Sequence, residues 1–175
     1  DALVLAQYSV GLSVTLEECG VSGPTPTPTT GGECTPATYE LQAETEAEWD
    51  DATVDSNKDG YTGSGFVNTA NSSGRWIEWK VTIAEASNAD VSFRYANGSS
   101  ARAMTLSING TDTDTLAFPA TGGWTTWKEE TASIIMDGGT NAIRITATTS
   151  GGAPNIDKMD ITISCGGIVT PTPSP

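Results

Sequence analysis

Apolar and polar residues alternate with a period of two along most of the chain from residue 39 to residue 164. Turn-forming groups such as Asn109-Gly110 and Asp137-Gly138-Gly139 separate the alternating runs. A period of two is the repeat of a strand with one buried face, and these turn residues tolerate positive φ. The pattern predicts about eight strands and no competing helix. They are expected at residues 39–45, 76–83, 90–96, 103–109, 113–118, 126–136, 142–147 and 156–164.

Strands of this number and spacing are typical of an all-β fold, and we expect a β-sandwich of the jelly-roll kind. The first and last strands are expected to lie side by side. Residues 1–22 also alternate, but one strand without partners does not fold by itself. We expect these residues to be a poorly ordered tail of a preceding domain or an artificial remnant.

Two segments rich in proline and threonine flank the strands. Residues 23–33 contain the run Pro-Thr-Pro-Thr-Pro-Thr-Thr, and residues 167–175 end in Thr-Pro-Thr-Pro-Ser-Pro. Proline fixes φ and lacks an amide donor, so such segments stay extended and solvated. The sequence therefore predicts a folded module, residues 34–166, between one linker and the start of a second.

The composition restricts the ligands that the module can bind. The net charge is −14, with 8 basic and 22 acidic residues, which disfavours nucleic acid because its binding requires a basic face. No stretch approaches the run of about 18 apolar residues that a membrane span needs. The chain has no histidine, which excludes Ser-His and Cys-His nucleophiles and His-ligated zinc. Neutral ligands and cations are the easier partners.

The three cysteines give an odd count. Cys34 stands just before the first clear strand and Cys165 just after the last. If those strands are antiparallel neighbours, a Cys34–Cys165 disulfide would close the sandwich, which fits an oxidising, extracellular setting. Cys19 would then lack a partner. Three unpaired thiols are the alternative.

Several short segments follow one another in a familiar order. They are residues 39–44 (YELQAE), 60–67 (GYTGSGFV), 92–97 (SFRYAN), 107–110 (SING), 121–127 (TGGWTTW) and 155–160 (NIDKMD). In this order they resemble carbohydrate-binding modules of families 6 and 35, and the glycine-rich second segment is similar to family 35. The resemblance covers residues 37–165. It implies a jelly roll with a structural calcium ion and a sugar site in the loops at one end.

A cation site is expected at the first strand. Glu40, Gln42 and Glu44 would share one face of that strand. Oxygen-bearing groups in a row suit a hard cation such as Ca²⁺, which takes about six to eight oxygen ligands. An ordinary solvated polar face is the alternative.

The last strand would complete this cation site if it pairs with the first. Either Asp157 or Asp160 could then supply a carboxylate. The resemblance implies Gln42, Glu44 and this terminal acid as the ligands of a structural Ca²⁺. We expect Asp160, because it alternates with apolar neighbours and therefore points outward.

Residues 55–60 (DSNKDG) match the first half of an EF-hand loop. The twelfth position is Phe66 in place of the bidentate glutamate, and no helices flank the segment. We therefore expect a polar turn here.

Binding a pyranose ring requires a flat aromatic side chain together with groups that form paired hydrogen bonds to its hydroxyls. Trp79 and Trp127 lie within strand alternation and are expected in the core. Trp124 follows two glycines in a loop, and the resemblance gives this position the stacking role. Tyr61, in the glycine-rich segment, is a candidate second aromatic, with Phe66 as the alternative.

Three polar residues are further candidates for sugar contacts. Asn155 matches the ligand-binding asparagine that the resemblance implies, and its amide can both donate and accept hydrogen bonds. Arg102 is the one cation close to a candidate binding loop in the sequence. Asn97 and Arg102 could equally be a turn residue and a surface charge.

These observations predict a secreted, monomeric, non-catalytic module that holds a covalently attached glycoside hydrolase on plant cell-wall hemicellulose. Because the surface is acidic, we expect a neutral β-1,4-linked polysaccharide, β-mannan first and xylan next. Uronic acids of pectin or glucuronoxylan, bound through a calcium-assisted site, are the alternative.

Two other classes of function make different demands on the sequence. A carbohydrate-active enzyme would need a carboxylate pair in a cleft, whereas most acids here fall in turns, on edges or beside linkers. A structural or adhesive spacer would show no glycan affinity.

Overall fold

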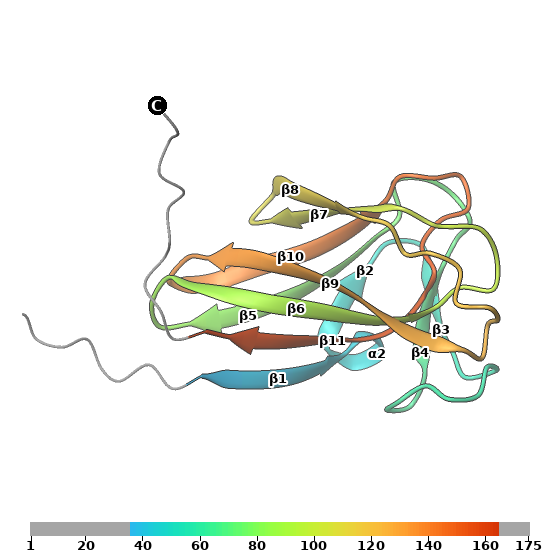
Figure 1. Cartoon of the computed structure of the whole chain (residues 1–175), viewed down its shortest axis with the longest axis horizontal. Coiled ribbons are helices and arrows are strands. Elements are labelled where there is room, and N and C mark those ends of the chain that lie inside the picture. Colours follow the sequence, from blue (N-terminus) through green and yellow to red (C-terminus); the bar gives the residue numbers. More distant parts are fainter. Residues whose placement is uncertain (1–35, 165–175) are drawn as a thin grey trace, which may run out of the picture. The chain divides into compact units, whose positions relative to one another are not determined.

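The computed structural model describes residues 36–164, and the fold described below is that of these residues. They form eleven strands and one short helix. The strands pair in antiparallel fashion and make two sheets that pack face to face (Figure 1).

One sheet has six strands in the order β3-β4-β11-β6-β9, with β1 also paired to β11. The bounds are β1 (Ala37–Gln42), β3 (Ala52–Asp55), β4 (Phe66–Thr69), β6 (Ser87–Ala96), β9 (Trp127–Met136) and β11 (Asn155–Ile163). The other sheet has five strands in the order β2-β5-β10-β7-β8. The bounds are β2 (Ala47–Trp49), β5 (Trp76–Ile83), β7 (Met104–Ile108), β8 (Thr111–Leu116) and β10 (Gly139–Ala147). Helix α2 (Ala43–Glu46) lies between β1 and β2.

This architecture confirms the predicted all-β sandwich. Each predicted strand has a counterpart, and the first and last lie side by side, with Ala37 opposite Ile163 and Gln42 opposite Lys158. The pattern missed β2, β3, β4 and α2. Each of these has three or four residues, which is too short for a period to be visible.

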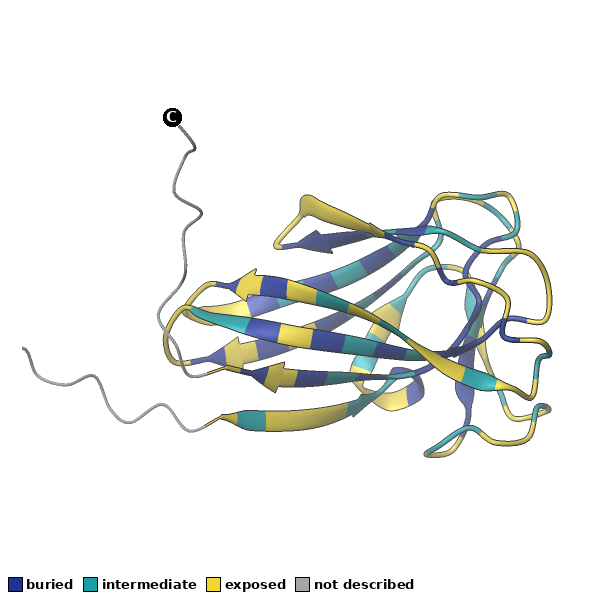
Figure 2. Ribbon diagram, in the orientation of Figure 1, coloured by how far each residue is buried: buried dark blue, intermediate teal, exposed yellow. Residues whose placement is uncertain are grey.

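The core lies between the two sheets, filled by the inward side chains of alternating positions (Figure 2). Phe93 is fully buried, with its ring centroid 5.7 Å from Trp79 and 6.3 Å from Phe118. Burying an aromatic or aliphatic side chain of this size contributes about 1.5–3 kcal/mol. The core therefore supplies a rigid platform for the loops.

The two ends of the sandwich differ. At one end β7 and β8 are joined by the predicted turn at Asn109 and Gly110, whose φ angles of 52° and 80° suit a tight hairpin. The longer connections gather at the other end (Figure 1). They are residues 56–65, 70–75, 97–103, 117–126 and 148–154. Side chains from distant parts of the sequence can converge there.

Several predictions concern other parts of the chain. The tail at 1–22, the linkers at 23–33 and 167–175, and the Cys34–Cys165 disulfide lie outside the described residues and stay predictions. Among residues 36–164, no helix has the length and apolar character needed to cross a membrane.

Candidate functional site

A pocket of about 320 Å³ opens among the long loops. Its lining residues come from β3, β4, β11 and four connections. They are Asp55, Asn57, Lys58, Asn68, Asn71, Arg102, Trp124 and Asn155. The pocket unites three of the expected sugar-contacting residues, namely Trp124, Arg102 and Asn155.

Trp124 is a partly exposed aromatic wall of this pocket. It follows Gly122, whose φ of 102° turns the chain before β9. Gly98 lies so close to the indole that any side chain there would collide with it. The Arg102 guanidinium carbon is 5.1 Å from the ring centroid, a cation–π arrangement. These contacts fix the orientation of a flat apolar surface suited to stacking on a sugar ring.

Arg102 is held by neutral groups. Its Nη1 donates to the Ala153 carbonyl at 2.7 Å and to Asn71 Oδ1 at 3.2 Å, and its Nε donates to Ser99 Oγ at 3.2 Å. Burial lowers the pKa of Arg102 from its ordinary value. A guanidinium stays charged in proteins, so this positive charge remains available to an anion.

The pocket is also lined by basic side chains that form no ion pair with a carboxylate of the described residues. Of the 8 lysine and arginine residues, five form ion pairs with carboxylates of the described residues. The three that form none within residues 36–164 are Lys58, Arg102 and Lys128. Two of them, Lys58 and Arg102, line the pocket. The pocket's own carboxylate, Asp55, accepts from Asn68 Nδ2 at 2.9 Å and from Thr53 Oγ1 at 3.0 Å.

Asn155 offers a free amide. The residue is only 5% exposed and opens β11 at the edge of the pocket. Its side-chain amide forms no hydrogen bond within the described part of the chain. The amide atoms are not among the buried, unpartnered polar atoms of the described residues, so a ligand with vicinal hydroxyls can reach and hydrogen-bond them.

Two of the residues expected to contact the sugar, Asn97 and Tyr61, do not line this pocket. Asn97 is fully buried; its Nδ2 donates to the carbonyls of Ser100 and Phe118 at 2.9 and 3.0 Å. Its amide therefore shapes the β6–β7 connection and is not available to a ligand. Tyr61 lies outside the pocket and packs on Phe66, with ring centroids 5.9 Å apart.

The two tryptophans expected in the core have different surroundings. Trp79 is fully buried, which confirms that prediction. Trp127 is only partly buried, which corrects the other. It packs edge-on against Phe66 at 5.6 Å, and its Nε1 donates to the Asp59 carbonyl at 2.9 Å.

Most of the polar residues that line the pocket were not predicted from the sequence. Asp55, Asn57 and Lys58 belong to the segment that resembles half of an EF-hand loop, which we expected to be a polar turn. The concentration of short polar side chains in this segment could have indicated a binding site. Nothing in the local sequence marks Asn68 and Asn71 as pocket residues, because their place beside the pocket depends on the pairing of β4 with β11.

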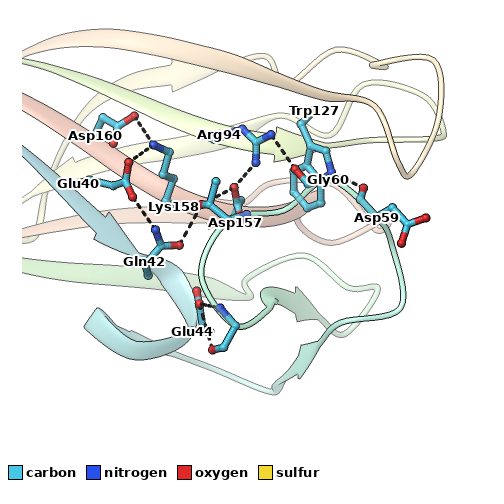
Figure 3. A network of polar contacts seen from close by, with 12 residues as sticks. Glu40, Gln42, Glu44, Asp59, Gly60, Arg94, Trp127, Asp157, Lys158 and Asp160 are labelled. Carbon is cyan, nitrogen blue, oxygen red and sulfur yellow. Dashed lines mark hydrogen bonds and ion pairs between the residues drawn. The ribbon is translucent and has the colours of Figure 1, made fainter.

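A second polar centre surrounds the start of α2 (Figure 3). Glu44 is 9% exposed; its Oε1 accepts from the Ser64 amide at 2.8 Å, whereas its Oε2 is buried without a hydrogen-bond partner. Gly63, at φ 64°, lies against this group. A Cβ there would be 2.8 Å from Gln42 Oε1 and would also collide with Glu44 Oε1. The glycine leaves a space that oxygen atoms line.

Asp157 is the acid that approaches Gln42. Thr62 Oγ1 bridges the two, at 3.1 Å from Gln42 Oε1 and 3.0 Å from Asp157 Oδ2. Asp157 is fully buried and forms an ion pair with Arg94. Burial raises the pKa of Asp157, and the hydrogen bonds from Thr62 and Arg94 oppose that rise.

Asp160 is joined to Gln42 through Lys158 and Glu40, since Gln42 Nε2 donates to Glu40 Oε1 at 2.8 Å. Lys158 Nζ is 3.1 Å from Asp160 Oδ2, and the same ammonium group pairs with Glu40 (Figure 3). Asp160 faces outward as alternation predicts. A register shift between Ile156 and Lys158 redirects Asp157, which alternation alone does not foresee.

Within residues 36–164, no three Asp, Glu, Cys or His side chains gather closely enough to hold a metal by themselves. The donors around Gly63 are a mixed set of carboxylate, amide and hydroxyl oxygens. Such a set, with one carboxylate oxygen left unsatisfied, fits a hard cation and does not fit a soft one.

Comparison with known proteins identifies the fold and the family. A family model described as "Carbohydrate binding module (family 6)" matches residues 42–163. A family 35 carbohydrate-binding module from Cellvibrio japonicus superposes with a TM-score of 0.68 at 36% identity, covering 75% of this chain and 95% of that one. Another family 35 module, in complex with a disaccharide containing glucuronic acid, gives 0.65 at 36% identity, covering 74% and 98%. These matches confirm the expected jelly roll.

Similar sequences occur as parts of larger enzymes. An exo-β-D-glucosaminidase from Amycolatopsis orientalis is 43% identical over 110 residues, which are 62% of this chain and 11% of that protein. An endo-1,4-β-xylanase from Cellvibrio japonicus is 40% identical over 114 residues, which are 63% and 19%. The chain thus spans less than a fifth of the length of these relatives.

Proposed function

The chain belongs to the carbohydrate-binding modules of the family 6 and family 35 type, and from this premise we propose that its pocket binds uronic acid units of plant cell-wall polysaccharides. It is a binding module and not a catalytic domain. Its role is to hold an attached, secreted glycoside hydrolase close to the polymer, which raises the local substrate concentration.

The observation that carries this proposal is the pair of unpaired cations, Lys58 and Arg102, in one pocket. A uronate differs from a neutral hexose by a carboxylate at C6, and a charge-assisted hydrogen bond to a carboxylate is about twice as strong as a neutral one. The indole of Trp124 would stack on the sugar ring, and Asn155 would hydrogen-bond the hydroxyls. In this arrangement Lys58 and Arg102 would bind the carboxylate, Trp124 the ring and Asn155 the hydroxyls.

The net charge of −14 by itself favours a neutral polymer such as β-mannan or xylan. Charges beyond about 8–10 Å are screened at physiological salt, so the charges inside the pocket outweigh those on distant surfaces. The similar module that was solved with a glucuronic acid disaccharide supports the same choice.

The second polar centre is proposed to hold a structural Ca²⁺. Gln42, Glu44 and Asp157 would supply oxygen ligands; Asp157 takes the place expected for Asp160 because it lies beside Gln42. A bound Ca²⁺ would be a partner for the buried Glu44 Oε2, which has no hydrogen-bond donor among the described residues.

The test compares methyl β-D-glucuronide with methyl β-D-glucoside, which differ only at C6, by isothermal titration calorimetry. The expected result is at least about ten-fold tighter binding of the glucuronide, since hydrogen bonds to charged groups contribute about 1.5–3 kcal/mol. Lys58→Met and Arg102→Met should each reduce this preference. Lys128→Met is the matched control, because Lys128 is equally unpaired among the described residues but lies outside the pocket.

Affinity electrophoresis through glucuronoxylan, pectin, mannan and xylan, with calcium and with chelator, extends the test to polymers. Retardation by mannan alone, unchanged by Lys58→Met, would refute the uronate proposal. Trp124→Ala should abolish retardation in every gel; unchanged retardation would remove Trp124 from the site.

A further inference from the structure

Lys58 lies in the connection between β3 and β4, residues 56–65, which has no strand or helix of its own. A long side chain on such a segment costs about 1.5–2 kcal/mol of conformational entropy to immobilise. Its contribution to ligand preference therefore depends on what holds the backbone next to it.

Two side-chain donors hold the backbone directly after Lys58 (Figure 3). Trp127 Nε1 donates to the Asp59 carbonyl at 2.9 Å, and Arg94 Nη2 donates to the Gly60 carbonyl at 2.8 Å. Both donors belong to strands of the six-stranded sheet, since Arg94 lies in β6 and Trp127 opens β9. The connection is thus fastened to the rigid part of the fold at consecutive residues.

The two donors also support each other. The Arg94 guanidinium carbon lies 5.2 Å from the centroid of the Trp127 ring, and the same guanidinium pairs with the fully buried Asp157. Gly60, at φ 93°, lets the backbone approach the indole closely, because a Cβ there would be 3.0 Å from Trp127 Cδ1. Neither Arg94 nor Trp127 lines the pocket.

We propose that Trp127 and Arg94 are positioning residues that set the place of Lys58 and thereby the preference of the pocket for a carboxylate. This inference rests on the proposed binding of uronic acids. It predicts that weakening either hydrogen bond lowers the affinity for an acidic sugar and leaves the stacking of the ring on Trp124 unaffected.

The test variant is Trp127→Phe, which keeps an aromatic ring against Arg94 and Phe66 and removes the Nε1 donor. By calorimetry, methyl glucuronide should bind about 3- to 10-fold more weakly, the range expected for one lost hydrogen bond. Binding of methyl glucoside should change by less than about two-fold, within the scatter of such measurements. The ratio of the two affinities is the decisive quantity, because general loosening of the fold would weaken both ligands equally.

A double-mutant cycle adds a second readout. Trp127→Phe should have little further effect in a Lys58→Met background, whereas its effect should add to that of Arg102→Met. Arg94→Lys is the second variant, since lysine keeps the charge beside Asp157 but cannot reach Gly60 with the same fork. Thermal melts followed by circular dichroism establish that each variant is folded.

Each outcome decides between the possibilities. If the wild-type chain does not prefer the glucuronide, both the proposed function and this inference fail. If it does, and Trp127→Phe and Arg94→Lys retain the preference or weaken both sugars alike, the inference alone fails. A reduced preference that disappears in the Lys58→Met background supports it.

Discussion

At the level of single residues, two glycines allow the backbone of the connections to pack closely against tryptophan rings in and near the pocket. Gly98 lies against Trp124, and Gly60 lies against Trp127. At both positions a side chain would push the connection away from an indole. Gly60 also has φ 93°, a region that strains residues with a Cβ.

Gly60→Ala should therefore lower both stability and affinity. The positive φ alone costs about 1–2 kcal/mol, and the new Cβ would displace the segment that carries Lys58. Calorimetry with methyl glucuronide and thermal melting measure the two effects. Gly74→Ala is the matched control, since Gly74 has φ 85° but open space around it, so it should lose stability and keep its affinity. Equal loss of affinity in both variants would contradict the role given to Gly60.

The resemblance implied Trp124 and Asn155, and the position of Arg102 near a candidate binding loop suggested that residue; the structure brings the three together. The resemblance also implied Gln42 and Glu44 as ligands of the proposed cation, and these two side chains lie close to each other around Gly63. Asn97 has the turn-forming role that the sequence left as its alternative. A side-chain amide in a loop can bind a ligand only if nearby backbone groups do not already occupy it. The Asn97 amide already donates to the carbonyls of Ser100 and Phe118.

At the scale of elements, the ends of the sandwich divide stability from binding. Asn141, in β10 at the end opposite the pocket, is fully buried and takes part in four hydrogen bonds within its surroundings. They join the turn after β9 to Asn109 in the β7–β8 turn. The amide thus ties two hairpins together.

Asn141→Ala should lower the free energy of unfolding by about 2–4 kcal/mol, because it leaves several backbone and side-chain groups unsatisfied. Its affinity for methyl glucuronide at 25 °C should be unchanged, since the site lies at the other end. Urea unfolding and calorimetry measure the two quantities. Thr111→Ala, at an exposed position of β8 whose side chain forms no hydrogen bond among the described residues, should change stability by less than about 0.5 kcal/mol. A loss of affinity in folded Asn141→Ala would show that the two ends are coupled.

At the scale of the whole molecule, the proposed Ca²⁺ would link three separate parts of the chain. Gln42 ends β1, Glu44 lies in α2 and Asp157 lies in β11. A ligand that binds the folded state alone stabilises it by mass action, by about 2.7 kcal/mol at a hundred times its Kd.

Calcium should accordingly raise the melting temperature, and Glu44→Gln should reduce that increase. Glu48→Gln is the control, since Glu48 is an exposed partner of Lys80. Calorimetric melts in calcium and in excess chelator measure the effect. Identical melts in both would refute the metal proposal without touching the sugar pocket, whose affinity is measured separately.

The local pattern of apolar and polar residues predicts the all-β sandwich, most of its strands and the adjacency of the first and last. A period of two fixes which side chains face the core, and that information is local to each strand. Tertiary structure decided the site. A register shift in β11 turns Asp157 inward, where Thr62 joins it to Gln42, and the folding of the chain places Lys58 and Arg102 in one pocket. Charges and amides act over a few ångströms in space, and sequence separation does not report that distance.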